Sequence, residues 1–257
     1  MSRGRAAHSP APTLDSIVSP GFRFYQPRDG YRINIDTVIL FDFARTHAKG
    51  RVLEIGSAAG VVSLLLAKQA EVRQVTGIEL DAGLHALALR NQRINNSGDK
   101  TVFINSDIND YKARFRPQSF DAVVTNPPFY RHGTGKASAR RGVAAAHHDG
   151  SLTLDDTLKA ARYLLKPKGL MIMLFPSLRT EDLLKQLRGF AVEVLRFVHR
   201  RSDGPSDVFL MLARKGGGRQ LRIVPPLIVH EGDGYSREVL GILHPGIRGS
   251  SPSPASR

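Results

Sequence analysis

The most specific pattern in the sequence is Asn126-Pro127-Pro128-Phe129, which follows a short apolar segment predicted as a strand. Paired prolines stiffen the backbone and remove two amide donors. The side-chain oxygen of Asn126 and the carbonyl of Pro127 then become fixed acceptors that match the two hydrogens of an exocyclic NH2 group. Phe129 can stack on the ring that carries this group. The alternative is a simple turn after a strand, where Asn-Pro is common.

A turn of small residues, 54–60 (EIGSAAG), joins a predicted strand to a predicted helix. In α/β sheets, ligands bind where the carboxyl end of a strand meets the beginning of a helix. Glycine allows the backbone to approach such a ligand closely. Glu54, Gly56 and Gly60 are therefore candidate ligand-binding residues. Taken alone, the segment is explained equally well as a tight turn without a ligand.

Two further predicted strands end in acidic residues. Glu79, roughly 20 residues beyond the glycines, is placed to accept hydrogen bonds from both hydroxyls of a ribose. Asp107 is placed to accept a hydrogen bond from the adenine amine of a cofactor. Singly, each carboxylate is better explained as a helix cap or a surface charge. Three successive strands that end in ligand-type residues together favour a cofactor site.

These residues lie in an alternation of short apolar segments and helical segments, which predicts βαβ units and a parallel sheet. The predicted strands are 51–55, 74–79, 101–106, 121–125 and 170–175, followed by an antiparallel hairpin of 192–199 and 207–215. The predicted helices are 59–68, a second helix after the N-cap Asp81, 154–165 and 180–188. One face of the second helix carries Leu84, Leu87, Asn91 and Ile94.

This order of elements resembles the S-adenosylmethionine-dependent methyltransferases of class I, which implies an α/β, Rossmann-like fold. Such a fold has a mostly parallel seven-stranded sheet with a terminal antiparallel hairpin. The turn 54–60 resembles their E/D-x-G-x-G-x-G motif, except that Ala58 stands at the middle glycine. The resemblance implies S-adenosylmethionine as cofactor. Its binding residues would be Glu54, Gly56, Gly60, Glu79, Asp107 and Asn126.

With this cofactor, Asn126 and Pro127 would hold both hydrogens of the target nitrogen, so that its lone pair attacks the sulfonium methyl group in line. The nitrogen can release a proton after it gains the methyl group, so no strong general base is required. The sequence therefore predicts an N-methyltransferase with Asn126, Pro127 and Phe129 as its catalytic residues.

Outside these shared motifs, residues 25–40 (YQPRDGYRINIDTVIL) look like the amino-terminal signature of the bacterial tRNA(Val) adenine-N6 methyltransferases, which modify the adenosine beside the anticodon. Residues 196–199 (RFVH) and 225–235 look like the carboxyl half of that family. The resemblance covers approximately residues 21–243. It implies methyl transfer to the exocyclic N6 of adenine in tRNA, with Asn126 and Phe129 gripping the adenine.

Other functions remain open. A protein glutamine N5-methyltransferase is the first alternative, because an amide NH2 also suits an Asn-Pro-Pro-aromatic loop. Such enzymes commonly carry tyrosine in place of Phe129 and have a separate amino-terminal helical domain, for which the roughly 50 residues before the first strand are too few. N-methylation of ribosomal RNA or DNA shares the loop chemistry. A non-catalytic RNA-binding protein is favoured by Ala58 alone.

The charge of the chain predicts a polyanionic partner. The 257 residues include 37 Lys+Arg against 23 Asp+Glu, a formal net charge of +14. Nucleic acid, and tRNA in particular, is the first candidate, and a generally basic proteome is the alternative. The basic segment 130–150 is expected to close over the substrate, and Arg200 and Arg201 extend the basic surface. The candidate substrate-binding residues are Pro128, Tyr130, Arg131, Lys136, Arg140 and Arg141.

The composition also excludes several classes of site. The absence of cysteine excludes disulfides, thiolate zinc sites and cysteine nucleophiles. No apolar segment has the roughly 20 residues of a membrane span. No metal site is expected, because His147-His148-Asp149 lies in the basic segment and is predicted to be exposed. We expect a soluble cytoplasmic monomer, with a methyltransferase domain at 21–244 between disordered tails at 1–20 and 245–257.

Overall fold

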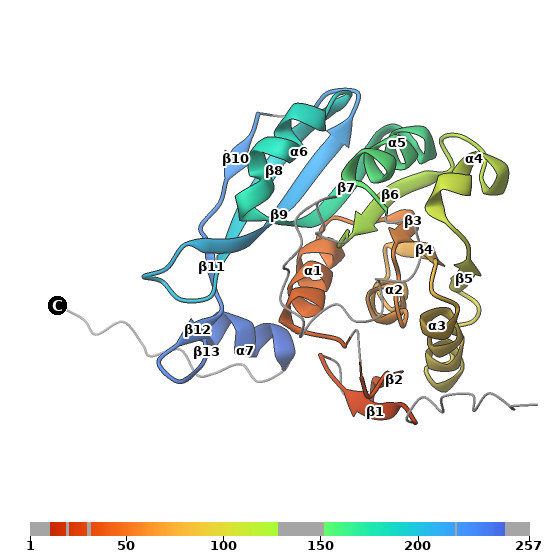
Figure 1. The fold of residues 1–257 in the computed structure, drawn as a ribbon, viewed down its shortest axis with the longest axis horizontal. Coiled ribbons are helices and arrows are strands. Elements are labelled where there is room, and N and C mark those ends of the chain that lie inside the picture. The colour runs from red at the N-terminus through yellow and green to blue at the C-terminus, as the bar shows by residue number, and fades with distance from the viewer. Residues whose placement is uncertain (1–10, 19–20, 30–31, 128–151, 219, 245–257) are drawn as a thin grey trace, which may run out of the picture.

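The computed structural model describes residues 11–18, 21–29, 32–127, 152–218 and 220–244. Its centre is one twisted sheet with the strand order β10-β8-β9-β7-β6-β3-β4-β5, and β11 also pairs with β8 (Figure 1). The strands are β3 (Gly50–Ile55), β4 (Val72–Glu79), β5 (Thr101–Asn105), β6 (Phe120–Thr125), β7 (Leu165–Pro176), β8 (Phe190–His199), β9 (Ser206–Lys215), β10 (Arg222–Ile223) and β11 (Leu227–Ile228).

The sheet confirms the predicted Rossmann-like arrangement. β5, β4, β3, β6 and β7 are parallel, and β9 runs antiparallel between β7 and β8. The seven predicted strands are present with shifted ends. Two short strands, β10 and β11, add to the edge at β8, so the described part of the sheet has nine strands. At two residues each, they are too short to show a periodic sequence pattern.

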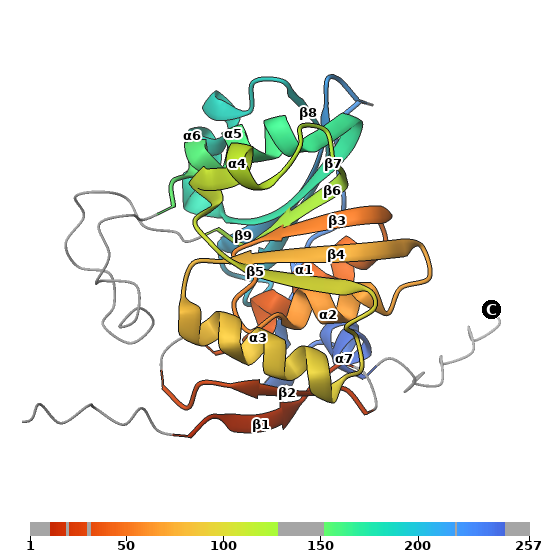
Figure 2. The same cartoon turned by 90° about the vertical axis from the view of Figure 1, so that its right-hand side faces the viewer.

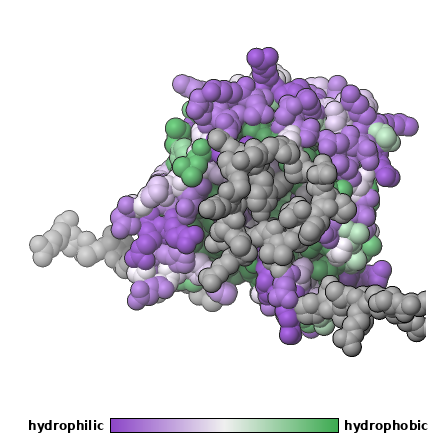
Figure 3. All heavy atoms as spheres, in the orientation of Figure 1, coloured by the Kyte–Doolittle hydropathy of each residue, from purple (hydrophilic) through white to green (hydrophobic). Residues whose placement is uncertain are grey.

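Helices cover both faces of the sheet (Figures 1 and 2). One face carries α1 (Ile35–Arg45), α2 (Val61–Ala67), α3 (Ala82–Ile94) and α7 (Arg237–Leu243). The other carries α4 (Tyr111–Arg114), α5 (Leu154–Leu164) and α6 (Thr180–Gln186). Each layer has its own hydrophobic core, and α2 is buried on all sides. On the face shown in Figure 3, the coloured side chains around the periphery are mostly hydrophilic.

Capping residues determine where two of the helices begin. Asp81 accepts a hydrogen bond from the amide of Leu84 at 2.8 Å, which confirms it as the N-cap of α3. α5 begins with a capping box formed by Thr153 and Asp156. β7 begins at Leu165, five residues earlier than predicted and directly after α5 ends at Leu164, and therefore contains Pro167-Lys168-Gly169.

An amino-terminal hairpin lies beneath α3 (Figure 2). It consists of β1 (Thr13–Ser16) and β2 (Arg23–Gln26), so ordered structure begins inside the 1–20 segment expected to be a tail. The hairpin was not predicted because its short strands, which carry several polar side chains, show no clear hydrophobic pattern. Residues 1–10 and 245–257 lie outside the described residues. A smaller pair is formed by β12 (His230–Glu231) and β13 (Gly234–Tyr235).

The described residues contain neither a membrane-spanning helix nor a cluster of metal ligands. None of their helices has the length and apolar character needed to cross a membrane. Their His, Asp and Glu side chains form no group of three suited to a metal ion. The predicted exposed group His147-His148-Asp149 lies outside the described residues.

The layer under β4 leaves no space at Gly77. A Cβ at this position would lie 2.7 Å from Cδ1 of Phe103 and 2.8 Å from Cβ of Ser57. We expect Gly77→Ala to lower the free energy of unfolding by about 1 to 3 kcal/mol through overpacking, measured by urea denaturation. Phe103→Leu in the same chain should restore part of the loss. Gly98→Ala, where a Cβ meets no atom within 4 Å, is the control. An equal loss in the two single variants would contradict this explanation.

Candidate functional site

The turn between β3 and α2, residues 56–60, is called the glycine loop below. Three of its residues have left-handed backbone angles, with φ of +75° at Gly56, +46° at Ala58 and +80° at Gly60. A Cβ at Gly60 would lie 2.6 Å from Cζ of Phe103, so only glycine fits there. The amides of Gly56 and Ser57 both donate to the carbonyl of Ile78, at 2.9 and 3.0 Å. These contacts fix the loop against β4.

Glu79 holds the glycine loop from the end of β4. Its Oε2 accepts a hydrogen bond from the amide of Ala58 at 2.8 Å, and its Oε1 accepts one from the amide of Asp81 at 2.8 Å. Burial raises the pKa of this carboxyl, and the two amide hydrogen bonds oppose that rise. Each oxygen keeps a second lone pair, so Glu79 can shape the loop and still accept hydrogen bonds from a ligand.

Glu54 lies deeper, beneath the same loop. Its carboxyl group is 5% exposed and accepts hydrogen bonds from both the amide and the hydroxyl of Ser63 in α2. Burial raises the pKa of Glu54 to about 8, although the Ser63 hydrogen bonds act in the opposite direction. Glu54 is therefore mainly protonated at neutral pH, and it ties the start of α2 to β3.

Asn126 follows β6 at the same edge of the sheet. Ile55 and Thr125 are partners in the parallel pair β3·β6, so Asn126 and Gly56 emerge side by side. The hydroxyl of Thr125 donates to the carbonyl of Ile55 at 3.0 Å and locks the two strand ends together. The Oδ1 atom of Asn126 is buried and has no hydrogen-bond partner within the described residues. Buried acceptors are normally paired in folded proteins, so this atom marks a place where a donor is expected.

A pocket opens beside these residues. It brings together Glu54, Gly56 and Asn126 of the predicted site. Gly60 lies at the far end of the loop and is not in the wall. The complete lining is Ile33, Thr37, Leu40, Glu54, Gly56, Ser57, Ala58, Val61, Val62 and Asn126.

Asp107 stands beyond the pocket, near Glu79. β4 and β5 pair Glu79 with Asn105, and the amide of Ser106 donates to the Glu79 carbonyl at 3.1 Å. Oδ1 of Asp107 accepts a hydrogen bond from the amide of Asn109 at 2.8 Å and caps the 3-10 turn Ile108–Asp110. The capping role considered from sequence is therefore present, and it leaves the second carboxylate oxygen for a ligand.

Sequence reasoning missed three groups in this region. The pocket wall includes Ile33, which precedes α1, and Thr37, which lies in α1. This segment carries a family signature in the sequence, but no helix was predicted there. Ser57 has a buried Oγ without a partner within the described residues. Leu80 follows Glu79 and is 49% exposed, an apolar surface beside two carboxylates. Only the Asn34 N-cap of α1 offered a usable local signal.

The remaining predicted residues divide into two sets. Pro127 is described and buried. Arg200 and Arg201 lie in the β8–β9 turn, where Arg200 approaches Asp207 at 3.5 Å and Arg201 donates to the carbonyl of Gly232 at 3.0 Å. The following predicted residues lie outside the described part of the chain: Pro128, Phe129, Tyr130, Arg131, Lys136, Arg140 and Arg141.

Comparison with known proteins places this geometry in a wider group. Residues 31–195 match the family model of the methyltransferase small domain. The tRNA1(Val) (adenine(37)-N6)-methyltransferase of Dickeya chrysanthemi is 27% identical over 220 residues, which are 84% of this chain and 86% of that protein. The protein of the same name from Aeromonas hydrophila is 25% identical over 232 residues, 88% of this chain and 96% of that protein.

Solved structures share the fold at low identity. A predicted O-methyltransferase from Agrobacterium tumefaciens superposes with a TM-score of 0.60 at 16% identity, over 82% of this chain and 95% of that chain. TYW2 of M. jannaschii in complex with AdoMet gives a TM-score of 0.54 at 14% identity, over 80% and 85%. These similarities support the class I methyltransferase fold.

Ala58 is strained in its present conformation. A non-glycine residue in the left-handed region destabilises the folded chain by roughly 1 to 2 kcal/mol. Glycine removes this strain, but part of the gain is lost because glycine has more conformational entropy in the unfolded chain. Ala58→Gly keeps the amide that Glu79 holds. We expect a gain in the free energy of unfolding of up to about 1 kcal/mol, measured by thermal and urea denaturation. Ala59→Gly, beside it and without a positive φ, should lose stability instead. A loss in both variants would show that residue 58 is not strained.

Glu54 should make stability depend on pH. Its pKa lies at about 8 in the folded chain against an ordinary value of 4.5, so its contribution is complete below 4.5 and is lost as pH rises toward 8. Glu54→Gln replaces the ionisable carboxyl group with a neutral amide. The unfolding free energy of the native chain, minus that of the variant, should fall between these pH values by at most about 1.4 kcal/mol per unit. Parallel pH profiles would contradict the assignment.

Proposed function

Since this chain belongs to the methyltransferase small domain family, we propose that it transfers the methyl group of S-adenosylmethionine to the exocyclic N6 of an adenine in tRNA, near the anticodon. The catalytic unit is the 21–244 segment, acting as a monomer in the cytoplasm. The relatives named tRNA1(Val) (adenine(37)-N6)-methyltransferase match over most of their length, which supports this choice of substrate.

One observation carries the proposal. Asn126 Oδ1 is a buried acceptor with no partner among the described residues, at the edge of the sheet where the glycine loop also lies. An adenine NH2 provides the missing donor. The Pro127 carbonyl is the second acceptor, and Phe129 stacks on the base. Because both hydrogens of the amine are then held, its lone pair is directed at the methyl donor.

The residues around the pocket fit S-adenosylmethionine, which when bound supplies a methyl group on a positively charged sulfur. The glycine loop exposes main chain beside an open space, with no atom within 4 Å of a Cβ built at Gly56. The free lone pairs of Glu79 suit ribose hydroxyls, the exposed Leu80 suits an adenine face, and Asp107 suits the adenine amine. Ser57 Oγ and the neutral Glu54 complete the polar wall near Asn126.

Charge supports a polyanionic substrate. The net charge of +14 favours RNA phosphates over a small neutral substrate. The turn with Arg200 and Arg201 follows β8 at the carboxyl edge of the parallel strands, the edge that carries Asn126. Tyr130, Arg131, Lys136, Arg140 and Arg141, in the segment after the Asn126 loop, extend the same contact.

The direct test is methyl transfer from radiolabelled S-adenosylmethionine to bulk bacterial tRNA that lacks the modification, followed by nucleoside analysis. We expect label in N6-methyladenosine. Asn126→Ala should lower kcat by about 100-fold or more, because the amine loses one of its two fixed acceptors. Its affinity for S-adenosylhomocysteine, measured by calorimetry, should stay within about threefold, since most of the cofactor contacts remain.

Asn95→Ala is the matched control, because Asn95 caps the end of α3 and lies outside the pocket wall. It should retain transfer. Labelled release-factor protein or ribosomal RNA, with unlabelled tRNA, would overturn the substrate and keep the fold and cofactor. Binding of the cofactor product without transfer to any RNA would instead indicate a non-catalytic RNA-binding protein.

A further inference from the structure

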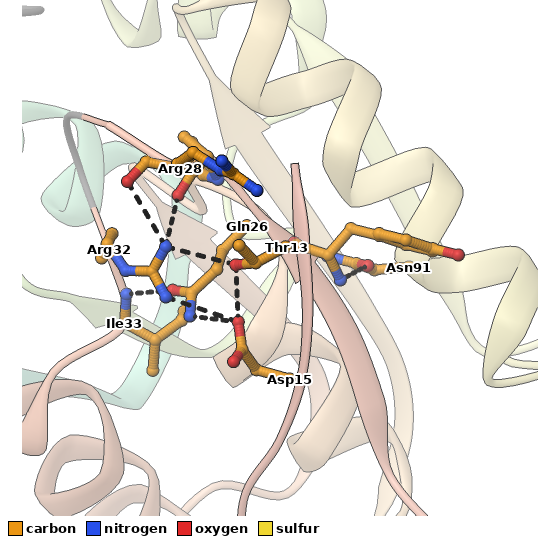
Figure 4. Close-up of polar contacts among 9 residues, drawn as sticks. Thr13, Asp15, Gln26, Arg28, Arg32, Ile33 and Asn91 are labelled. Carbon is orange, nitrogen blue, oxygen red and sulfur yellow. Dashed lines mark hydrogen bonds and ion pairs between the residues drawn. The ribbon is translucent and has the colours of Figure 1, made fainter. Parts of the chain in front are cut away.

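One buried side chain joins the amino-terminal hairpin to the glycine loop. Asn91 lies in the third turn of α3 and is 0% exposed. Its Nδ2 donates to the carbonyl of Tyr25 and to the carbonyl of Ala59, each at 2.9 Å. Its Oδ1 accepts from the amide of Tyr25 at 2.6 Å. Figure 4 shows Asn91 meeting the backbone of β2, 66 positions away in the chain.

These contacts require an asparagine. Both amide hydrogens and the amide oxygen are used, and the partners are two carbonyls and one amide of the main chain. Aspartate would direct an acceptor at two carbonyls, and an apolar residue would leave all three main-chain groups unpaired in the interior. The pattern of donors and acceptors thus explains a polar residue on the inward face of α3.

A chain of hydrogen bonds leads from Tyr25 to one wall of the pocket. The neighbouring Gln26, 5% exposed, accepts from the amide of Ile33 at 2.9 Å and donates to Asp15 at 2.7 Å. Arg32, which precedes Ile33, donates to the carbonyl of Pro27 at 2.8 Å. Ile33 then lines the pocket. The position of this wall therefore depends on where β2 is held.

The opposite wall is reached through Ala59. This residue stands between Ala58, whose amide is held by Glu79, and Gly60, which caps α2. The Nδ2 atom of Asn91 donates a hydrogen bond to the carbonyl of Ala59. The same amide group therefore fixes both the hairpin that positions Ile33 and the loop that presents Ala58.

We propose that Asn91 is a positioning residue that sets the distance between the two walls of the cofactor pocket. The inference rests on the proposed function, because it assigns the pocket to S-adenosylmethionine. Asn91 is absent from the pocket lining, and its effect passes through the Tyr25 and Ala59 backbone. Its loss lets the hairpin and the glycine loop move apart, which weakens cofactor binding and leaves the Asn126 loop intact.

The test compares Asn91→Ala with Asn95→Ala. Asn95, the C-cap of α3 one turn beyond Asn91, donates to the carbonyl of Arg23 at 2.7 Å, so it also holds the hairpin. Its side-chain hydrogen bonds go to Arg23 and Asn91 and not to the glycine loop. We expect Asn91→Ala to weaken S-adenosylhomocysteine binding and raise the KM for S-adenosylmethionine by about tenfold or more. Its kcat at saturating cofactor should stay within about threefold. Asn95→Ala should change affinity by less than about twofold.

Two results would overturn the proposal. One is a loss of thermal stability in Asn91→Ala with unchanged affinity for S-adenosylhomocysteine, which would make the residue merely structural. The other is an equal loss of affinity in both variants, which would assign the effect to hairpin docking alone. If Asn91→Ala does not fold, Asn91→Ser replaces it, because its hydroxyl buries no charge and can donate to at most one of the two carbonyls.

Hydrogen exchange separates this proposal from the assignment of the cofactor. In the free protein, Asn91→Ala should speed exchange at the Ile33 and Ala58 amides together, whereas Asn95→Ala should not affect Ala58. If native protein fails to bind S-adenosylhomocysteine, the proposed function fails, yet joint release of the two amides would still support Asn91 as the link. Faster exchange at only one of the two amides in Asn91→Ala would refute Asn91 as the connection between the hairpin and the glycine loop, whichever ligand the pocket binds.

Discussion

The hydrogen bond between the Ala58 amide and the Glu79 carboxylate joins the ends of two neighbouring strands, and the shape of the site depends on it. A loop with three left-handed residues cannot satisfy its amides by regular pairing, so it needs acceptors from elsewhere. Glu79 supplies one acceptor and the Ile78 carbonyl supplies another. With its amides held from β4, the loop keeps its main chain open toward the pocket.

This arrangement places two acidic groups in poorly solvated positions. Burial raises the pKa of both Glu54 and Glu79, which favours their neutral forms. The groups differ in what opposes the rise. Glu79 faces two main-chain amides and is half-buried. Glu54 is almost completely enclosed, and among the described residues its hydrogen bonds come from Ser63 alone. A ligand with ribose hydroxyls would add donors to Glu79 and stabilise its charged form.

The sequence was informative wherever a local pattern carried the structure. Alternating apolar and helical segments predicted β3 to β9 and the helices α2, α3, α5 and α6, but not the short α4. Asp81 was recognisable as a cap because its partner is three residues away. The hairpin β1–β2 has no such pattern, since its stability comes from contacts such as Gln26 to Asp15 and Tyr25 to Asn91. Asn91 itself appeared only as one position on a helix face. Partners 66 residues apart leave no periodic trace.

The candidate site follows the same division. Glu54, Gly56 and Asn126 could be brought together from sequence because parallel strands align their carboxyl ends. The wall that faces them could not, because Ile33 and Thr37 belong to a segment whose path is set by Gln26, Arg32 and Asn34. The glycine loop and this wall are separate in the chain but share one anchor in α3. The affinity of the pocket for its ligand then depends on Asn91, which lies outside the pocket wall. The glycine-loop motif alone therefore does not determine that affinity.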